Sequence, residues 1–206
     1  MQKKIIAGLL TLTIGLSCIA GGKVRIDIKG IKNKIPLTFG KCDKNIVLQR
    51  ITEEAAADQQ YTVCARSKTG TTKDWKKYSF SFTPQASGLI SIYFRGPVVC
   101  DATGKQLKIW IAYDNIKVTG TKAKFGDFEY ANKKDFFDGF KGCTANMVTD
   151  VEDAQSGKNY VVTWHSSPVL QTLNIIKGQT VTVTFYAKQS NGKVLQKTVG
   201  ASNNIG

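Results

Sequence analysis

The chain has few of the residues that usually carry catalysis, and its only histidine is His165. His165 is followed by Ser166, but adjacent residues on a strand point to opposite faces, so the two do not form a hydrogen-bonded catalytic pair. No Gly-x-Ser-x-Gly motif is present. Glu152 and Asp153 are neighbours and not a pair of carboxylates spaced across a cleft, which gives glycoside hydrolysis little support. We therefore expect that the protein is not an enzyme.

Acidic residues are also scarce: 29 lysines and arginines face 15 aspartates and glutamates, which leaves a formal net charge of +14. The basic residues occur in pairs such as Lys76-Lys77 and Lys133-Lys134, without a block of five or more. Such a charge predicts attraction to anionic surfaces, including anionic cell-surface polymers, although a merely solvated lysine-rich surface explains it equally well. Nucleic acid is not an expected partner because the chain shows no nucleic-acid-binding motif.

A long hydrophobic run occurs only at the start of the chain. Lys3 and Lys4 precede an apolar run over residues 5–19, and small residues follow. This pattern predicts a signal peptide over residues 1–20 and an exported protein, located in the periplasm, on the cell surface or outside the cell. A lipoprotein signal ending at Cys18 is the alternative, but Gly15 stands where such signals carry leucine.

The sequence contains five cysteines but no Cys-x-x-Cys pair, so neither a zinc site nor a thioredoxin-like redox centre is expected. Four cysteines lie beyond the predicted signal peptide: Cys42, Cys64, Cys100 and Cys143. Export permits disulfides, and these four cysteines allow several pairings among which the sequence does not choose. The sequence is compatible both with structural disulfides and with buried free thiols.

Helix signals are nearly absent, whereas strand signals recur along the chain. Residues 78–83 alternate large apolar with small polar side chains, the period of a half-buried strand. Further strands are predicted at residues 89–94, 107–112, 116–118, 160–164, 170–176 and 181–187. Residues 53–58 favour one helical turn at most. Short strands separated by turn signals predict an all-β protein with an antiparallel β-sandwich.

The chain also repeats itself. Residues 47–70 and 169–192 share Val, Leu, Gln, Thr, Ala, a basic residue and a closing Gly at the same spacing. A repeat of this length predicts one and a half copies of a domain, residues 21–121 without an opening strand and residues 122–206 without closing strands. Three interpretations follow. In the first, the segment at Phe125 closes the first sandwich; in the second, another chain completes the second copy. In the third, the reading frame is truncated. An open sheet edge favours pairing with a partner or a homo-oligomer.

Four segments resemble galactose-binding-like jelly-roll domains, a superfamily with many carbohydrate-binding modules. Gly126-Asp127-Phe128-Glu129 is similar to their opening motif, and residues 170–188, 75–83 and 113–118 are similar to later segments, in rotated order. The resemblance implies a jelly-roll sandwich that binds polysaccharides or other glycans. It also implies a structural calcium ion between Glu129 and Asp114, the positions that match the opening and closing motifs.

Aromatic residues are the main candidates for ligand binding. Flat rings stack on the apolar faces of sugars, while basic groups reach the hydroxyls. We expect Trp110, Trp164, Tyr93 and Arg95 to bind the ligand, with core packing as the alternative for each tryptophan. The predicted function is therefore non-catalytic carbohydrate binding at the cell envelope or outside the cell. The alternative is a structural or adhesion module completed by strand pairing with a partner protein.

Overall fold

The computed structural model describes residues 22–31, 34–42, 46–50, 61–66, 73–129 and 139–192. The predicted signal peptide, Cys18 and the helical turn expected at residues 53–58 lie outside the described residues. Within the described part, no helix is both long and apolar enough to cross a membrane.

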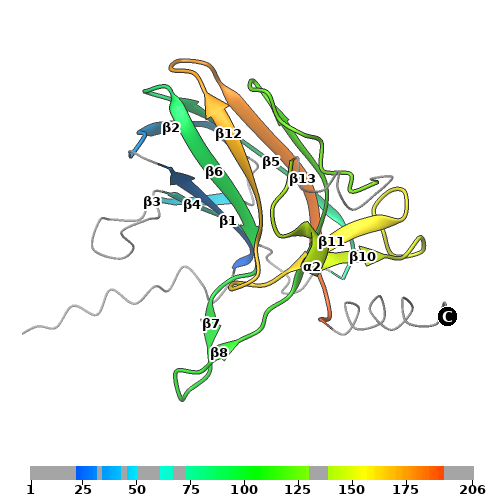
Figure 1. Cartoon of the computed structure of the whole chain (residues 1–206). Coiled ribbons are helices and arrows are strands. Elements are labelled where there is room, and N and C mark those ends of the chain that lie inside the picture. Colours follow the sequence, from blue (N-terminus) through cyan, green and yellow to red (C-terminus); the bar gives the residue numbers. More distant parts are fainter. Residues whose placement is uncertain are drawn as a thin grey trace, which may run out of the picture.

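Two large antiparallel sheets form most of the described part of the chain (Figure 1). The first, sheet A, has the order β12 (Val169–Ile175), β6 (Gly88–Arg95), β1 (Gly22–Gly30), β4 (Tyr61–Arg66) and β3 (Ile46–Arg50). The second, sheet B, has the order β10 (Met147–Thr149), β11 (Asn159–Thr163), β9 (Ile111–Thr119), β13 (Val181–Gln189), β5 (Lys76–Pro84) and β2 (Leu37–Cys42).

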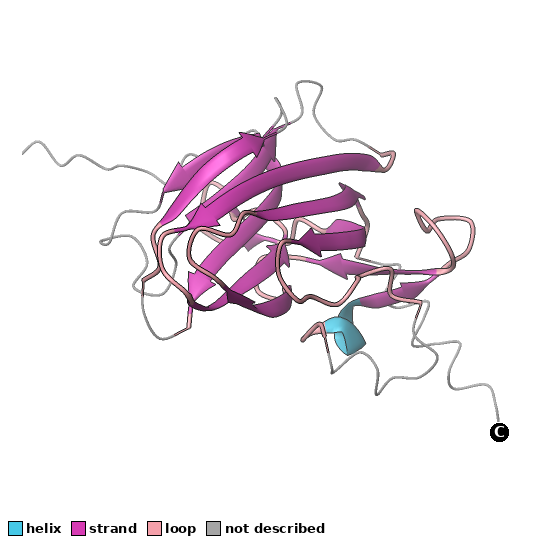
Figure 2. Ribbon diagram, turned by 90° about the horizontal axis from the view of Figure 1, so that it is seen from above, coloured by secondary structure: helices cyan, strands magenta, loops and turns pink. Residues whose placement is uncertain are grey.

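Two small elements lie outside the sheets. A hairpin of β7 (Val99–Cys100) and β8 (Gln106–Leu107) projects from one end of the sandwich (Figure 1). A single helical turn, α2 (Cys143–Asn146), lies at the margin of the strands (Figure 2).

Alternating side chains bury one face of each sheet. In β5, Tyr78, Phe80 and Phe82 are buried and the residues between them are more exposed. The two sheets meet through aromatic rings: Phe94 of β6 packs edge-on against Phe185 of β13, with 5.8 Å between ring centroids. Such packing places the core between the sheets. The prediction of an all-β antiparallel sandwich is confirmed.

The strands of the structure differ in part from the predicted ones. Residues 107–112 do not form one strand, because β8 ends at Leu107 and β9 begins at Ile111. The predicted strands also did not include β1, where Val24, Ile26 and Ile28 are buried in the core. β1 lies in the middle of sheet A, between β6 and β4.

Strands from both parts of the chain share both sheets. β12 pairs with β6, and β13 lies between β9 and β5. The predicted domain boundary between residues 121 and 122 therefore falls within this sandwich. The two repeated segments also occupy different places, since β3 and β4 pair with each other while β12 and β13 belong to opposite sheets.

Cysteine side chains do not join one another in the described part of the chain. Cys100 is an exposed free thiol in the β7–β8 hairpin, and Cys143 is a buried one at the start of α2. Burial raises the pKa of the Cys143 thiol to about 12, so this thiol stays protonated and unreactive at neutral pH.

Candidate functional site

Trp110 and Trp164 lie side by side at the ends of two neighbouring strands. Trp110 directly precedes β9, and Trp164 directly follows β11, which pairs with β9. The ring centroids are 6.1 Å apart, and the planes are tilted by 51°. Both side chains are half-buried, so each keeps part of its ring accessible.

Local structure explains this placement. Ile109 packs against the main core and Ile111 is buried in it, which turns Trp110 to the other side of the chain. Trp164 starts a tight turn in which the amide of Ser167 donates to its carbonyl at 3.1 Å. Lys108 Nζ lies 5.0 Å from the centre of the Trp164 ring. Two tilted indoles and a cation can hold a sugar by stacking and by hydrogen bonds to its hydroxyls.

Tyr93 and Arg95 lie on the outer face of sheet A, opposite to the face that holds Phe94. The Arg95 guanidinium carbon is 5.2 Å from the centre of the Tyr93 ring, and Lys29 Nζ is 5.1 Å from it. Arg95 is only 8% exposed and forms an ion pair with Asp27, Nε to Oδ2, at 3.1 Å.

Tyr93 and Arg95 lie close to Trp164 because the residue after Arg95 contacts its backbone. Gly96, directly after Arg95, lies so close to Trp164 that an added Cβ would come within 3.2 Å of its Cα and 2.1 Å of the Ile109 carbonyl oxygen. His165 is also near: burial, and then the positive charge of Arg95, lowers its pKa. Arg95 ends β6, Trp110 directly precedes β9 and Trp164 directly follows β11, and the β7–β8 hairpin connects β6 to β9. The predicted ligand residues therefore lie near the base of this hairpin.

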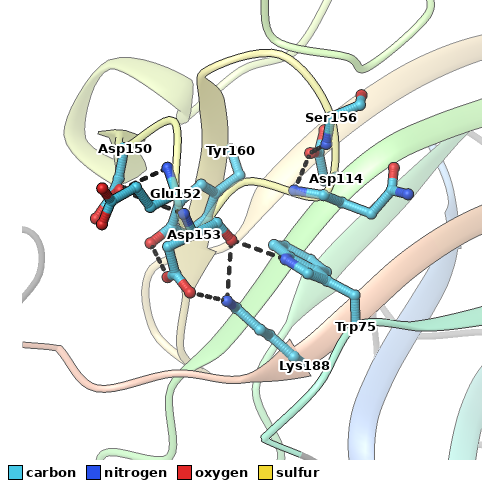
Figure 3. Close-up of polar contacts among 9 residues, drawn as sticks. Trp75, Asp114, Asp150, Glu152, Asp153, Ser156, Tyr160 and Lys188 are labelled. Carbon is cyan, nitrogen blue, oxygen red and sulfur yellow. Dashed lines mark hydrogen bonds and ion pairs between the residues drawn. The ribbon is translucent and has the colours of Figure 1, made fainter.

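A loop over residues 150–158 covers part of the outer face of sheet B, and Asp153 is its anchor (Figure 3). Trp75 Nε1 donates to the Asp153 carbonyl at 2.8 Å, and Lys188 Nζ donates to it at 3.0 Å. Lys188 also forms an ion pair with the Asp153 carboxylate, and the Tyr160 hydroxyl donates to that carboxylate at 2.6 Å.

Lys188 Nζ lies over two aromatic rings, 4.7 Å from the centre of Trp75 and 5.7 Å from that of Tyr160. Trp75 packs on the outer face of sheet B against a small second cluster with Tyr160 and Val162. Burial, together with the hydrogen bond to Asp153, raises the pKa of Tyr160. These contacts fix the loop and explain Trp75 as a structural residue. Sequence reasoning did not identify Asp153 or Lys188.

Asp114 and Glu129 hold the same loop from its other side. Asp114 Oδ2 accepts from the amides of Gln155 and Ser156 at 3.1 and 3.3 Å. Glu129 Oε1 accepts from the amides of Lys158 and Asn159 at 2.8 and 2.6 Å. Burial, opposed by these hydrogen bonds and assisted by the charge of Glu129, raises the pKa of Asp114 to about 7.

This arrangement does not fit the predicted calcium ion. Calcium needs several oxygen ligands, but N–H donors already occupy these carboxylate oxygens. Within the described ranges, no group of three or more His, Cys, Asp or Glu side chains is placed to hold a metal. The two carboxylates, as they stand, anchor a loop.

Comparisons with family models, curated proteins and solved structures gave no match to this chain. The resemblance to galactose-binding-like domains stays a prediction.

Proposed function

We propose that this protein is an exported, non-catalytic carbohydrate-binding protein of the galactose-binding-like jelly-roll type, acting at the cell envelope or outside the cell. The observation that carries the proposal is the pairing of Trp110 with Trp164 at the end of the sandwich. Neither ring belongs to the core between the sheets, whose buried aromatics are all phenylalanines and tyrosines. Trp110 packs against the small second cluster, as Trp75 does, but both Trp110 and Trp164 are only half-buried, so each retains a surface on which the C–H face of a pyranose can stack.

Affinity electrophoresis through gels that contain neutral or anionic polysaccharides tests the proposal, at low and at high salt. We expect retardation that persists at high salt, because stacking is not screened by ions as charge attraction is. The double variant Trp110→Ala, Trp164→Ala should lose it. Trp75→Phe is the matched control, since Trp75 is also half-buried on sheet B but is engaged with the loop. Equal retardation of the double variant and the parent protein would reject the tryptophan site.

Exposed apolar residues favour a second function, that of a structural or adhesion module. Ile31 and Leu89 are 47% and 43% exposed and are joined by a backbone hydrogen bond of 3.0 Å at one end of sheet A. Ile176, 57% exposed, follows the adjacent edge strand β12. Exposed apolar side chains beside a sheet edge suit a partner or a second copy. Light scattering after size exclusion should then show a dimer that Leu89→Lys converts to a monomer.

A further inference from the structure

Two buried arginines face each other on the outer face of sheet A. Arg25 of β1 and Arg95 of β6 are directly opposite in the antiparallel register, and they are 6% and 8% exposed. Asp27, which is fully buried, accepts a hydrogen bond from Arg25, Nε to Oδ1, at 2.9 Å, and it forms an ion pair with Arg95, whose Nε lies 3.1 Å from Oδ2. One carboxylate thus lies between two guanidinium groups.

This cluster carries more positive than negative charge. Lys29, two residues beyond Asp27 on the same face, adds a third cation close to Tyr93. Like charges directly opposite each other on a sheet destabilise it, and buried charges need partners. Neutral His165 supplies no compensating charge, because burial and the neighbouring arginines lower its pKa. Among the described residues of this cluster, one negative group therefore balances only one of the three cations.

The arginines also keep unused donors. Their contacts with Asp27 involve only the Nε atoms, and in the part of the chain that the structure describes, their terminal Nη atoms make no hydrogen bond. His165 Nδ1 is likewise buried without a hydrogen-bond partner among the described residues. Guanidinium groups bind carboxylate and sulfate through paired N–H donors, so the free donors suit an oxyanion.

We propose that Arg25, Arg95 and Lys29 bind an acidic group, a carboxylate or sulfate, of a polysaccharide whose sugar rings stack on Trp110 and Trp164. The inference rests on the proposed function and names its ligand class, acidic polysaccharides. The two places are connected, since Gly96 joins Arg95 to the backbone of Trp164. The small exposed fraction of the arginines suits the entry of one acidic group and not of a sugar ring. Half-buried Tyr93 and Lys29 form the rim.

Isothermal titration with polygalacturonate, alginate, hyaluronate and chondroitin sulfate tests the proposal, with the methyl esters of the first three as neutral counterparts. We expect at least one acidic polymer to bind about tenfold more tightly than its ester, the effect of a charge-assisted hydrogen-bond pair. Arg95→Lys keeps a positive charge beside Asp27 but loses the planar donors, and it should remove most of that tenfold preference. Lys29→Gln should weaken binding without disturbing the buried ion pairs. Lys117→Gln, an exposed lysine on sheet B, is the control.

A second titration separates this proposal from the proposed function. Monomeric glucuronate and inorganic sulfate should stabilise the protein against heat more than glucose and chloride at equal ionic strength, and Arg95→Lys should lose the difference. If they do so while no polymer binds through the tryptophans, the anion site holds and the glycan function fails. If neutral esters bind as tightly as acids and Arg95→Lys changes nothing, the anion site is overturned and the glycan function holds. Absence of any response to acidic sugars or sulfate overturns the anion site as well.

Discussion

At the scale of single residues, Lys188 links strand β13 to the loop over residues 150–158. It is 7% exposed, and it holds both the carbonyl and the carboxylate of Asp153 while lying over Trp75. Lys188→Met keeps the apolar stem but removes the charge, so the carbonyl and carboxylate lose a donor. We expect a loss of about 1–3 kcal/mol in the free energy of unfolding, measured by urea denaturation. Lys158→Met, in the same loop but exposed, should change it by less than about 0.5 kcal/mol. Equal effects of the two substitutions would contradict this role.

Asp114 should make stability depend on pH. Its pKa is raised from 3.8 to about 7, chiefly by burial, so the folded protein keeps a proton that the unfolded chain has released. In the window between these two values the folded state binds more protons, and its stability falls as pH rises. Denaturation midpoints measured from pH 4 to pH 8 should therefore decline for the parent protein and decline less for Asp114→Asn. An unchanged slope in the variant would show that Asp114 is ionised in the folded state.

His165 should act in the opposite direction over part of that window. Burial, and then the charges of Arg95 and Arg25, lowers its pKa below 6.5, so the unfolded chain binds the proton more readily. The free energy of unfolding that His165 contributes therefore rises as the pH increases from its lowered pKa in the folded protein through 6.5. The decline in the parent protein is thus partly masked, and His165→Gln should make it steeper. Measured together, Asp114→Asn and His165→Gln separate the contributions of Asp114 and His165 to the pH dependence of stability.

At the scale of elements, Gly120 directly follows β9 and lies against the backbone of Thr180, just before β13. Its φ is +83°, and a Cβ there would come 1.9 Å from the Thr180 carbonyl oxygen. Gly178 has a similar φ of +77° but open space around it. Gly178→Ala should cost about 1–2 kcal/mol, the strain of the left-handed conformation alone. Gly120→Ala adds a backbone clash and should cost at least about twice as much. Thermal denaturation of both variants measures the difference, and equal shifts would mean that the turn relaxes.

How far the sequence predicted each strand depended on its local pattern. Alternation of polar and apolar residues identified β5, β12 and β13 nearly to their ends. The same alternation exists in β1, with Val24, Ile26 and Ile28, but it directly follows the apolar run of the predicted signal peptide, so it does not stand out as a separate strand. Residues 108–110 alternate as a strand does, but among the described residues their backbone contact is a single hydrogen bond, from the Ser190 amide to the Trp110 carbonyl, and they form no strand.

The candidate site shows the same limit. Composition and local pattern singled out Trp110 and Trp164, since large rings are recognisable in any sequence. Their contact depends on the pairing of β9 with β11, which involves segments far apart in the chain. Asp153 and Lys188 were missed because their meeting depends on the adjacency of β9 and β13 and on the path of a loop. Contacts between segments that are far apart in the chain, such as that of Asp153 with Lys188, cannot be predicted from the spacing of residues in the sequence.

At the scale of the whole molecule, the two ends of the chain's described part depend on each other. β13 is hydrogen-bonded to β5 on one side and to β9 on the other, and it buries Val183 and Phe185 between the sheets. Without it, Tyr78, Phe80 and Phe82 of β5 would lose their neighbouring strand, and a sheet without its central strand does not retain a packed core. β12 likewise shields the edge of β6.

Residues 21–121 alone should therefore not fold, although the repeat suggested that they form a domain. We expect poorly dispersed amide resonances and a flat near-ultraviolet circular dichroism spectrum for this fragment. Co-expression with residues 122–206 should restore both signals, because β12 and β13 would then return to the places that they occupy in the intact chain. A control fragment, residues 21–192, retains every described strand and should fold by itself. A folded, monomeric 21–121 fragment would instead show that the first part can close its sheets without β13, and the sandwich would then be two domains that exchange strands.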